Sequence, residues 1–159
     1  MRIKYLPLLA LLFCAPLKSE QTPSLFSLGV GIYNVVKEKR AFQVQMEYKW
    51  GYAFYHIQPF TALFTTNQGA TYFCAGLCGD IFLGDKVVVT PSFAPGIYFQ
   101  GHGKNLGYPL EFRSSLALSY VLKNKDRIGA QFYHISNASL GHRNPGVESL
   151  IFFYAISFD

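Results

Sequence analysis

Apolar and polar residues alternate along much of the chain with a period of two, which is the period of side chains on a β-strand. The clearest case lies between residues 42 and 49, where four apolar side chains, from Phe42 to Tyr48, alternate with four polar ones, from Gln43 to Lys49. One face of this segment is therefore apolar and the other polar. This alternation is typical of a membrane-spanning strand whose apolar face meets lipid.

Similar extended segments follow one another after residue 19, and we find no helical period of useful length. Clusters of Gly, Pro, Asn and charged residues separate the segments and mark turns. The pattern predicts eight strands, over residues 26–36, 41–49, 54–65, 70–83, 86–100, 108–122, 127–136 and 147–158.

The connections between these segments fall into two kinds. Short charged turns are expected at 37–39, 83–86 and 123–126, and longer connections at 50–53, 66–69, 101–107 and 137–146. Short turns and long loops together are typical of a small outer-membrane barrel. The sequence therefore predicts an all-β fold, an eight-stranded antiparallel outer-membrane β-barrel.

Composition favours a membrane over water. Half of the residues are hydrophobic and 14% are charged, whereas about 25% charged residues is usual for a soluble domain. A soluble lipocalin-like barrel is the alternative, and its ligand cavity would explain an apolar interior. It would not explain apolar residues on both faces of several strands.

The first 19 residues predict a secretory signal peptide, with basic Arg2 and Lys4, an apolar stretch from Tyr5 to Ala15, and Ser19 at the expected cleavage site. Residues 20–159 then form a single barrel domain. Cleavage leaves 11 basic against 9 acidic residues, a net charge of +2. This small charge argues against nucleic acid as a partner, and export predicts the outer membrane as the location.

The chemistry is expected in the last two strands. His134 and Ser136 lie two residues apart, so their side chains share one face of a strand. The returning antiparallel strand brings Glu148 opposite this pair. A hydroxyl, an imidazole and a carboxylate in this arrangement form a nucleophile, a base and an orienting acid. Asn137 directly follows the proposed nucleophile and is a candidate oxyanion donor.

Several short motifs in this region resemble the lipid A 3-O-deacylase family, PagL: His134 to Ala138, Asn144-Pro145-Gly146 and Glu148-Ser149, with looser similarity at 101–107 and 110–113. The resemblance implies an eight-stranded outer-membrane barrel that hydrolyses the ester at position 3 of lipid A without a metal or other cofactor. It implies that His134, Ser136 and Glu148 are catalytic, that Asn137 is the oxyanion residue, and that the site faces the lipid.

Other candidate residues have weaker signals. Lys104 and Arg143 are expected in loops, where they are candidate contacts for lipid A phosphates, although a surface cation is the ordinary explanation. Glu111 and Arg113 share a strand face and are expected to pair inside the barrel. The partners implied are lipopolysaccharide and the outer membrane, and a homodimer stays open. The competing functions are a non-catalytic structural or adhesive barrel, and a barrel enzyme that acts on glycerophospholipids.

Overall fold

A computed structural model describes residues 19–37 and 40–158. Of the predicted signal peptide, it includes only Ser19. Eight long strands carry the fold: β2 (Ser24–Tyr33), β3 (Ala41–Lys49), β5 (Ile57–Thr66), β6 (Thr71–Gly79), β8 (Val87–Phe99), β9 (Leu110–Val121), β10 (Arg127–Ser136) and β11 (Val147–Phe158).

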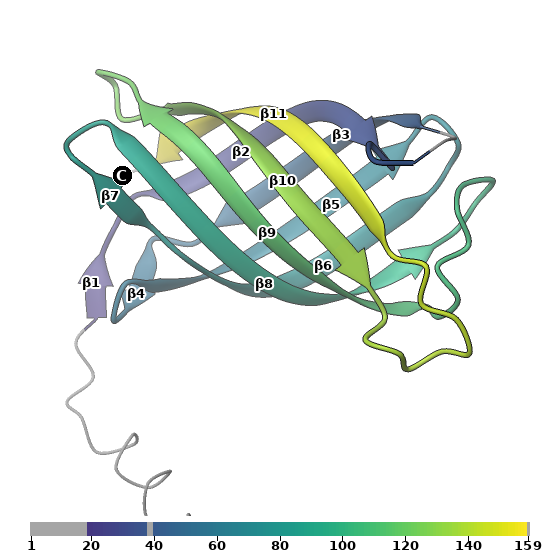
Figure 1. Ribbon diagram of the computed structural model, residues 1–159. Helices are drawn as coiled ribbons and strands as arrows, with labels where there is room; N and C mark the ends of the chain where they lie inside the picture. The colour runs from purple at the N-terminus through teal and green to yellow at the C-terminus, as the bar shows by residue number, and fades with distance from the viewer. Residues whose placement is uncertain (1–18, 38–39, 159) are drawn as a thin grey trace, which may run out of the picture.

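These strands form a closed antiparallel barrel (Figure 1). Each long strand pairs with its neighbours along the chain, and the first and last, β2 and β11, pair with each other over Tyr33–Ser149 to Ser24–Phe158. Closure leaves none of the eight strands with an open edge, which hydrocarbon could not satisfy with hydrogen bonds. The predicted all-β, eight-stranded fold is confirmed.

Three short strands modify this plan: β1 (Ser19–Gln21), β4 (Tyr52–Phe54) and β7 (Ile81–Leu83). The sequence predicted uninterrupted strands over 54–65 and 70–83, and both predictions are wrong in detail. Tyr55 and His56 have positive φ angles of 49° and 64° and form a turn between β4 and β5. Asp80 separates β6 from β7.

The connections divide between the two ends of the barrel. Residues 34–37 and 40, together with 67–70, 100–109 and 137–146, lie at one end, here called the loop end. The opposite end, here called the terminus end, carries the start of β2, the end of β11 and the connections at 50–56, 80–86 and 122–126. The first two of these connections include β4 and β7. The short turn predicted at 37–39 falls within the β2–β3 connection, whose described residues lie with the long loops, whereas the connection predicted at 50–53 lies opposite them. This corrects the grouping expected from their lengths.

The outer wall is apolar and the lumen is mixed. On β3, Phe42 is 54% exposed whereas Gln43 is fully buried, which places the predicted apolar face outside and the polar face inside. The inward-facing side chains include buried aromatic residues such as Phe60, Phe64 and Tyr133. A wall of this kind is stable only against lipid, because it leaves a wide belt of large apolar side chains exposed.

Arg113 lies at the centre of the lumen with no exposed surface. Its Nη2 donates to Glu47 Oε2 at 2.7 Å, and its guanidinium lies over the rings of Phe60 and Tyr133. The predicted partner was Glu111, which lies on the same strand and face. The ion pair instead joins β9 to Glu47 on β3. The Arg113 side chain extends away from its own strand into the lumen, where it can meet a side chain from another strand.

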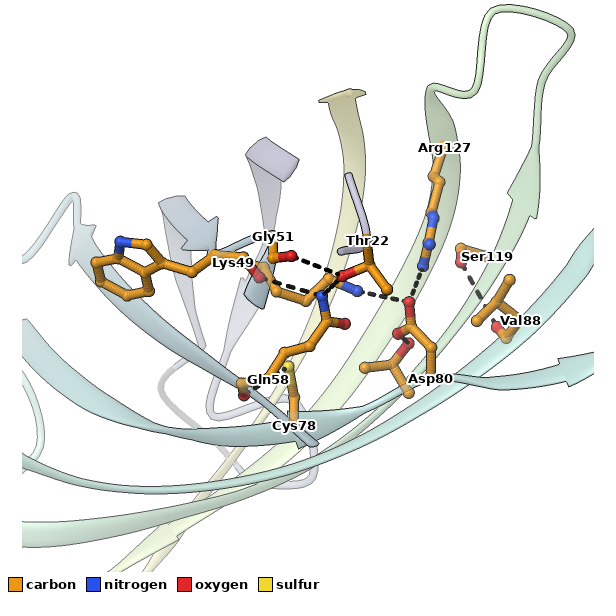
Figure 2. Close-up of polar contacts among 11 residues, drawn as sticks. Thr22, Lys49, Gly51, Gln58, Cys78, Asp80, Val88, Ser119 and Arg127 are labelled. Atoms are coloured by element: carbon orange, nitrogen blue, oxygen red, sulfur yellow. Dashed lines mark hydrogen bonds and ion pairs between the residues drawn. The ribbon is translucent and has the colours of Figure 1, made fainter. Parts of the chain in front are cut away.

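A second polar cluster lies inside the barrel near the terminus end (Figure 2). Asp80 Oδ2 accepts from Lys49 Nζ at 2.6 Å and from Arg127 Nη1 at 2.7 Å, and its Oδ1 accepts from Thr90 Oγ1 at 2.7 Å. Gln58 Nε2 donates to Thr22 Oγ1 at 2.5 Å. These contacts join β3, β8 and β10 and tie the segment before β2 across the opening, so the terminus end is braced from inside.

Candidate active site

His134 and Glu148 are direct cross-strand neighbours in the pair β10–β11. The antiparallel register places their side chains on the same face, and His134 Nδ1 lies 3.1 Å from Glu148 Oε1. The carboxylate is thus positioned to accept the Nδ1 hydrogen, which leaves Nε2 of the imidazole to exchange a proton with a reactant. The side chains are 45% and 21% exposed, so the pair is open to a ligand.

This face is the outer wall of the barrel. Tyr133 and Ile135 on β10, and Val147 and Ser149 on β11, are buried in the lumen. Because side chains alternate along a strand, His134 and Glu148 must point outward. The candidate site therefore lies on the membrane-facing wall, at the loop end of the two strands.

Ser136 is the last residue of β10 and lies two residues after His134 on the same outer face. It is half-buried, and its strand neighbour on β9 is Phe112. Among the described residues, the Ser136 hydroxyl forms no hydrogen bond with His134. The structure thus joins the His134 imidazole to the Glu148 carboxylate. Ser136 is the next residue on the same face of β10, and its Cα lies about 7 Å along the strand from the Cα of His134.

Gly146 covers the imidazole from the loop that precedes β11. A Cβ atom on this residue would lie 2.7 Å from His134 Cε1 and 3.2 Å from Nε2. The backbone of Gly146 has a φ of 57°, in the left-handed region that favours glycine. Both the close approach and the backbone conformation therefore require glycine here, and the segment Asn144-Pro145-Gly146 shapes one side of the site.

Asn137 is fully buried and links the two longest loops. Its Nδ2 donates to Leu106 O at 2.9 Å and to Arg143 O at 2.8 Å, and its backbone N donates to Asn144 Oδ1 at 3.0 Å. Both hydrogens of the side-chain amide are therefore in use within the protein. To serve as an oxyanion donor, the amide would have to give up one of these carbonyls, so that role stays a prediction.

Two lysines hold the segment that covers His134. Lys104 Nζ donates to Gly146 O at 2.5 Å and to Asn34 Oδ1 at 3.3 Å, and Lys37 Nζ donates to Pro145 O at 3.2 Å. Burial, followed by the nearby Lys37 ammonium, lowers the pKa of Lys104. The side chain of Arg143 is exposed and forms no hydrogen bond or ion pair with another described residue, whereas Lys104, the other predicted cation, donates to the segment beside the site.

Two residues beside the site, Lys37 and Ser114, were missed by the sequence analysis, and Gly146 was named there only as part of a motif, without its contact with His134. Ser114 is the neighbour of His134 on β9 and is exposed on the outer face. The alternation of β9 alone does not reveal its register with β10, so no sequence signal singled it out. Among residues 19–37 and 40–158, no group of three or more His, Cys, Asp or Glu side chains is arranged to hold a metal ion.

Comparison with known families decides the relationship. A profile of the family described as "Lipid A 3-O-deacylase (PagL)" matches residues 33–157, which is most of the chain. The chain belongs to the PagL family. The match includes β10, the 137–146 loop and nearly all of β11, so it covers His134, Ser136 and Glu148.

Solved structures agree on the fold of this PagL family member. The crystal structure of the outer membrane enzyme PagL matches with a TM-score of 0.65 at 18% identity, covering 84% of this chain and 99% of that one. Neisserial surface protein A (NspA) matches with a TM-score of 0.56 at 8% identity, covering 89% and 99% of the two chains. A de novo designed transmembrane β-barrel gives 0.62 at 7% identity, with coverage of 87% and 98%. No similar sequence was found among curated proteins.

Proposed function

We propose that this PagL family member is an outer-membrane serine esterase that removes the acyl chain at position 3 of lipid A. The observation that carries the proposal is the contact of His134 with Glu148 on the membrane-facing wall, with the Ser136 hydroxyl on the same face. A substrate that is itself a membrane lipid can reach such a site by lateral diffusion, whereas a site in the packed lumen would be closed to it.

The first step forms an acyl-enzyme. Ser136 Oγ attacks the carbonyl carbon of the 3-acyl ester while His134 Nε2 takes the hydroxyl proton. Glu148 holds the Nδ1 hydrogen and stabilises the imidazolium that results. Collapse of the tetrahedral intermediate breaks the bond to the sugar oxygen, and His134 returns the proton to that oxygen as the sugar hydroxyl leaves.

The second step releases the fatty acid. His134 Nε2 takes a proton from water, whose oxygen attacks the acyl carbonyl of the Ser136 ester. Breakdown of this second intermediate returns the proton to Ser136 Oγ. The water can reach the site because His134 lies at the loop end of β10 and is nearly half exposed.

The outer wall offers a place for an acyl chain. An apolar hollow of about 710 Å³ lies over β2, β3, β5, β10 and β11, with Phe152 and Tyr154 among its lining residues. Phe152 shares the outer face with Glu148 and follows it by four residues, or about 13 Å along the strand. An acyl chain on Ser136 that extended across β11 past Phe152 would reach this hollow.

The proposal is tested by expressing the protein in a Gram-negative host and comparing the mass spectra of its lipid A. We expect loss of one ester-linked acyl group with the wild-type protein and not with Ser136→Ala at equal folded amounts. Identical spectra from the two strains would favour the non-catalytic barrel. Loss of an acyl chain from glycerophospholipids instead would show a phospholipase.

A further inference from the structure

A hollow of about 420 Å³, lined by residues of polar type, opens at the loop end near the proposed active site. Asn34, Lys37, His102 and Lys104 are among its lining residues. They come from the connections β2–β3 and β8–β9, which are far apart in the sequence. Lys104 links the hollow to the site, because its Nζ donates to the carbonyl of Gly146, and a Cβ atom on that glycine would lie 2.7 Å from His134 Cε1.

Among the residues that the structure describes, no carboxylate is in direct contact with the two ammonium groups at this hollow. Each donates to a neutral backbone carbonyl of the 145–146 segment, and neither forms an ion pair with another described residue. Glu148, whose carboxylate acts on Lys104 through space, is hydrogen-bonded to His134. Two cations held side by side by neutral acceptors repel each other, and an anion between them would offset that repulsion.

We propose that Lys37 and Lys104 form a binding site for a phosphate group on the sugar that carries the ester. This inference rests on the proposed function and names the headgroup feature that the site recognises. An ammonium is a strong donor to phosphate oxygens. A phosphate on the reacting sugar would be fixed two contacts away from His134, through Lys104 and Gly146, so its binding would position the ester against Ser136.

The experiment compares two substrates in detergent micelles: a 3-O-acyl glucosamine lipid with a phosphate at position 1, and the same lipid without it. The ratio of their kcat/KM values is measured for the wild type, Lys37→Gln, the Lys37→Gln/Lys104→Gln double variant, and Lys123→Gln. Glutamine keeps an N–H that can donate to Pro145 O or Gly146 O. Lys123 is an exposed cation in the turn at the opposite end, so its variant controls for net charge.

We expect the wild type and Lys123→Gln to prefer the phosphorylated lipid by about tenfold, the effect of one charge-assisted contact. The ratio should fall towards one in Lys37→Gln and further in the double variant. If Ser136-dependent hydrolysis continues but the wild-type kcat/KM ratio is near one, the inference is overturned; a site for free phosphate would give this same result. The inference is also overturned if the preference for the phosphorylated lipid survives in the double variant. Absence of Ser136-dependent hydrolysis of both lipids would instead refute the proposed function and this inference with it.

Discussion

The backbone of Gly146 lies against the imidazole of His134, so closely that a Cβ atom there would come within 2.7 Å of Cε1. The ring is held on one side by this segment and bonded through Nδ1 to Glu148. Together these contacts fix the orientation of the imidazole before any substrate arrives. Such preorganisation is what an esterase base requires.

Gly146→Ala should therefore lower activity more than it lowers stability. The methyl group would push the ring away from its position, and a displacement of about 1 Å at a reacting group can cost about 10²-fold in rate. The check is kcat on a lipid A substrate together with the unfolding temperature of the barrel.

Gly84→Ala is the matched control for that variant. Gly84 also has a positive φ, 73°, but a Cβ there meets nothing within 4 Å. Both variants carry the same kind of backbone strain, about 1 to 2 kcal/mol. Equal losses of activity in the two would mean that the contact with His134 is not important.

Glu148→Gln should preserve the barrel and reduce hydrolysis by about 10²- to 10⁴-fold. The amide has nearly the shape of the carboxylate, but it cannot stabilise an imidazolium and can favour the wrong tautomer of His134. The measurement is kcat for purified protein, with heat-modifiable migration on a gel as the check of folding. Near wild-type turnover would remove Glu148 from the mechanism.

Asn137→Ala tests whether this residue organises the loops. The variant leaves the carbonyls of Leu106 and Arg143 without their donor, at a cost of about 1 to 3 kcal/mol for each buried group. We expect faster trypsin cleavage after Arg143, an exposed residue of the same loop, as well as lower activity. Cleavage after Lys123 at the other end is the internal reference. Lost activity with unchanged cleavage at Arg143 would instead favour the oxyanion role.

Asp126 gives the terminus end a dependence on pH. Hydrogen bonds from Tyr154 Oη, the Ser157 backbone N and Asn124 Nδ2 hold the pKa of this carboxyl below its usual value. When folding lowers the pKa of a carboxyl, the ionised group stabilises the folded state. This stabilisation is complete above the pKa of the unfolded chain, about 3.9 for Asp, and it is lost as the pH falls through the lower pKa of the folded state. Wild type should therefore unfold at a higher temperature than Asp126→Asn at pH 6, and the gap should narrow towards pH 3. A gap that is independent of pH would contradict this account.

The strand pattern was predictable because side-chain alternation follows directly from β geometry. The antiparallel return of β11 beside β10 likewise placed Glu148 opposite His134. The breaks at Tyr55-His56 and at Asp80 were not predictable, because positive φ angles at Tyr and His have no strong local signal. Arg113 shows a second limit, since alternation along one strand gives the face of a side chain and not its partner across the lumen.

The loop end shows the same limit at the site. The position of Asn137 in the sequence indicated an oxyanion donor, but its partners come from a loop 31 residues away and from the residue six positions ahead. Lys37 is a similar case, because a charged turn gave no reason to expect contact with Pro145. Contacts of this kind depend on how the four loops pack at one end of the barrel.

The most direct test of the account is to identify the nucleophile by covalent labelling. Purified barrel in detergent is treated with a long-chain alkyl fluorophosphonate, and the modified peptide is located by mass spectrometry in wild type, His134→Ala and Ser136→Ala. The account predicts a single adduct on Ser136 in the wild type, much slower labelling in His134→Ala, and none at this peptide in Ser136→Ala. An adduct on Ser114 or on Ser139, a serine of the loop that follows β10, or labelling of Ser136 that does not depend on His134, would contradict it.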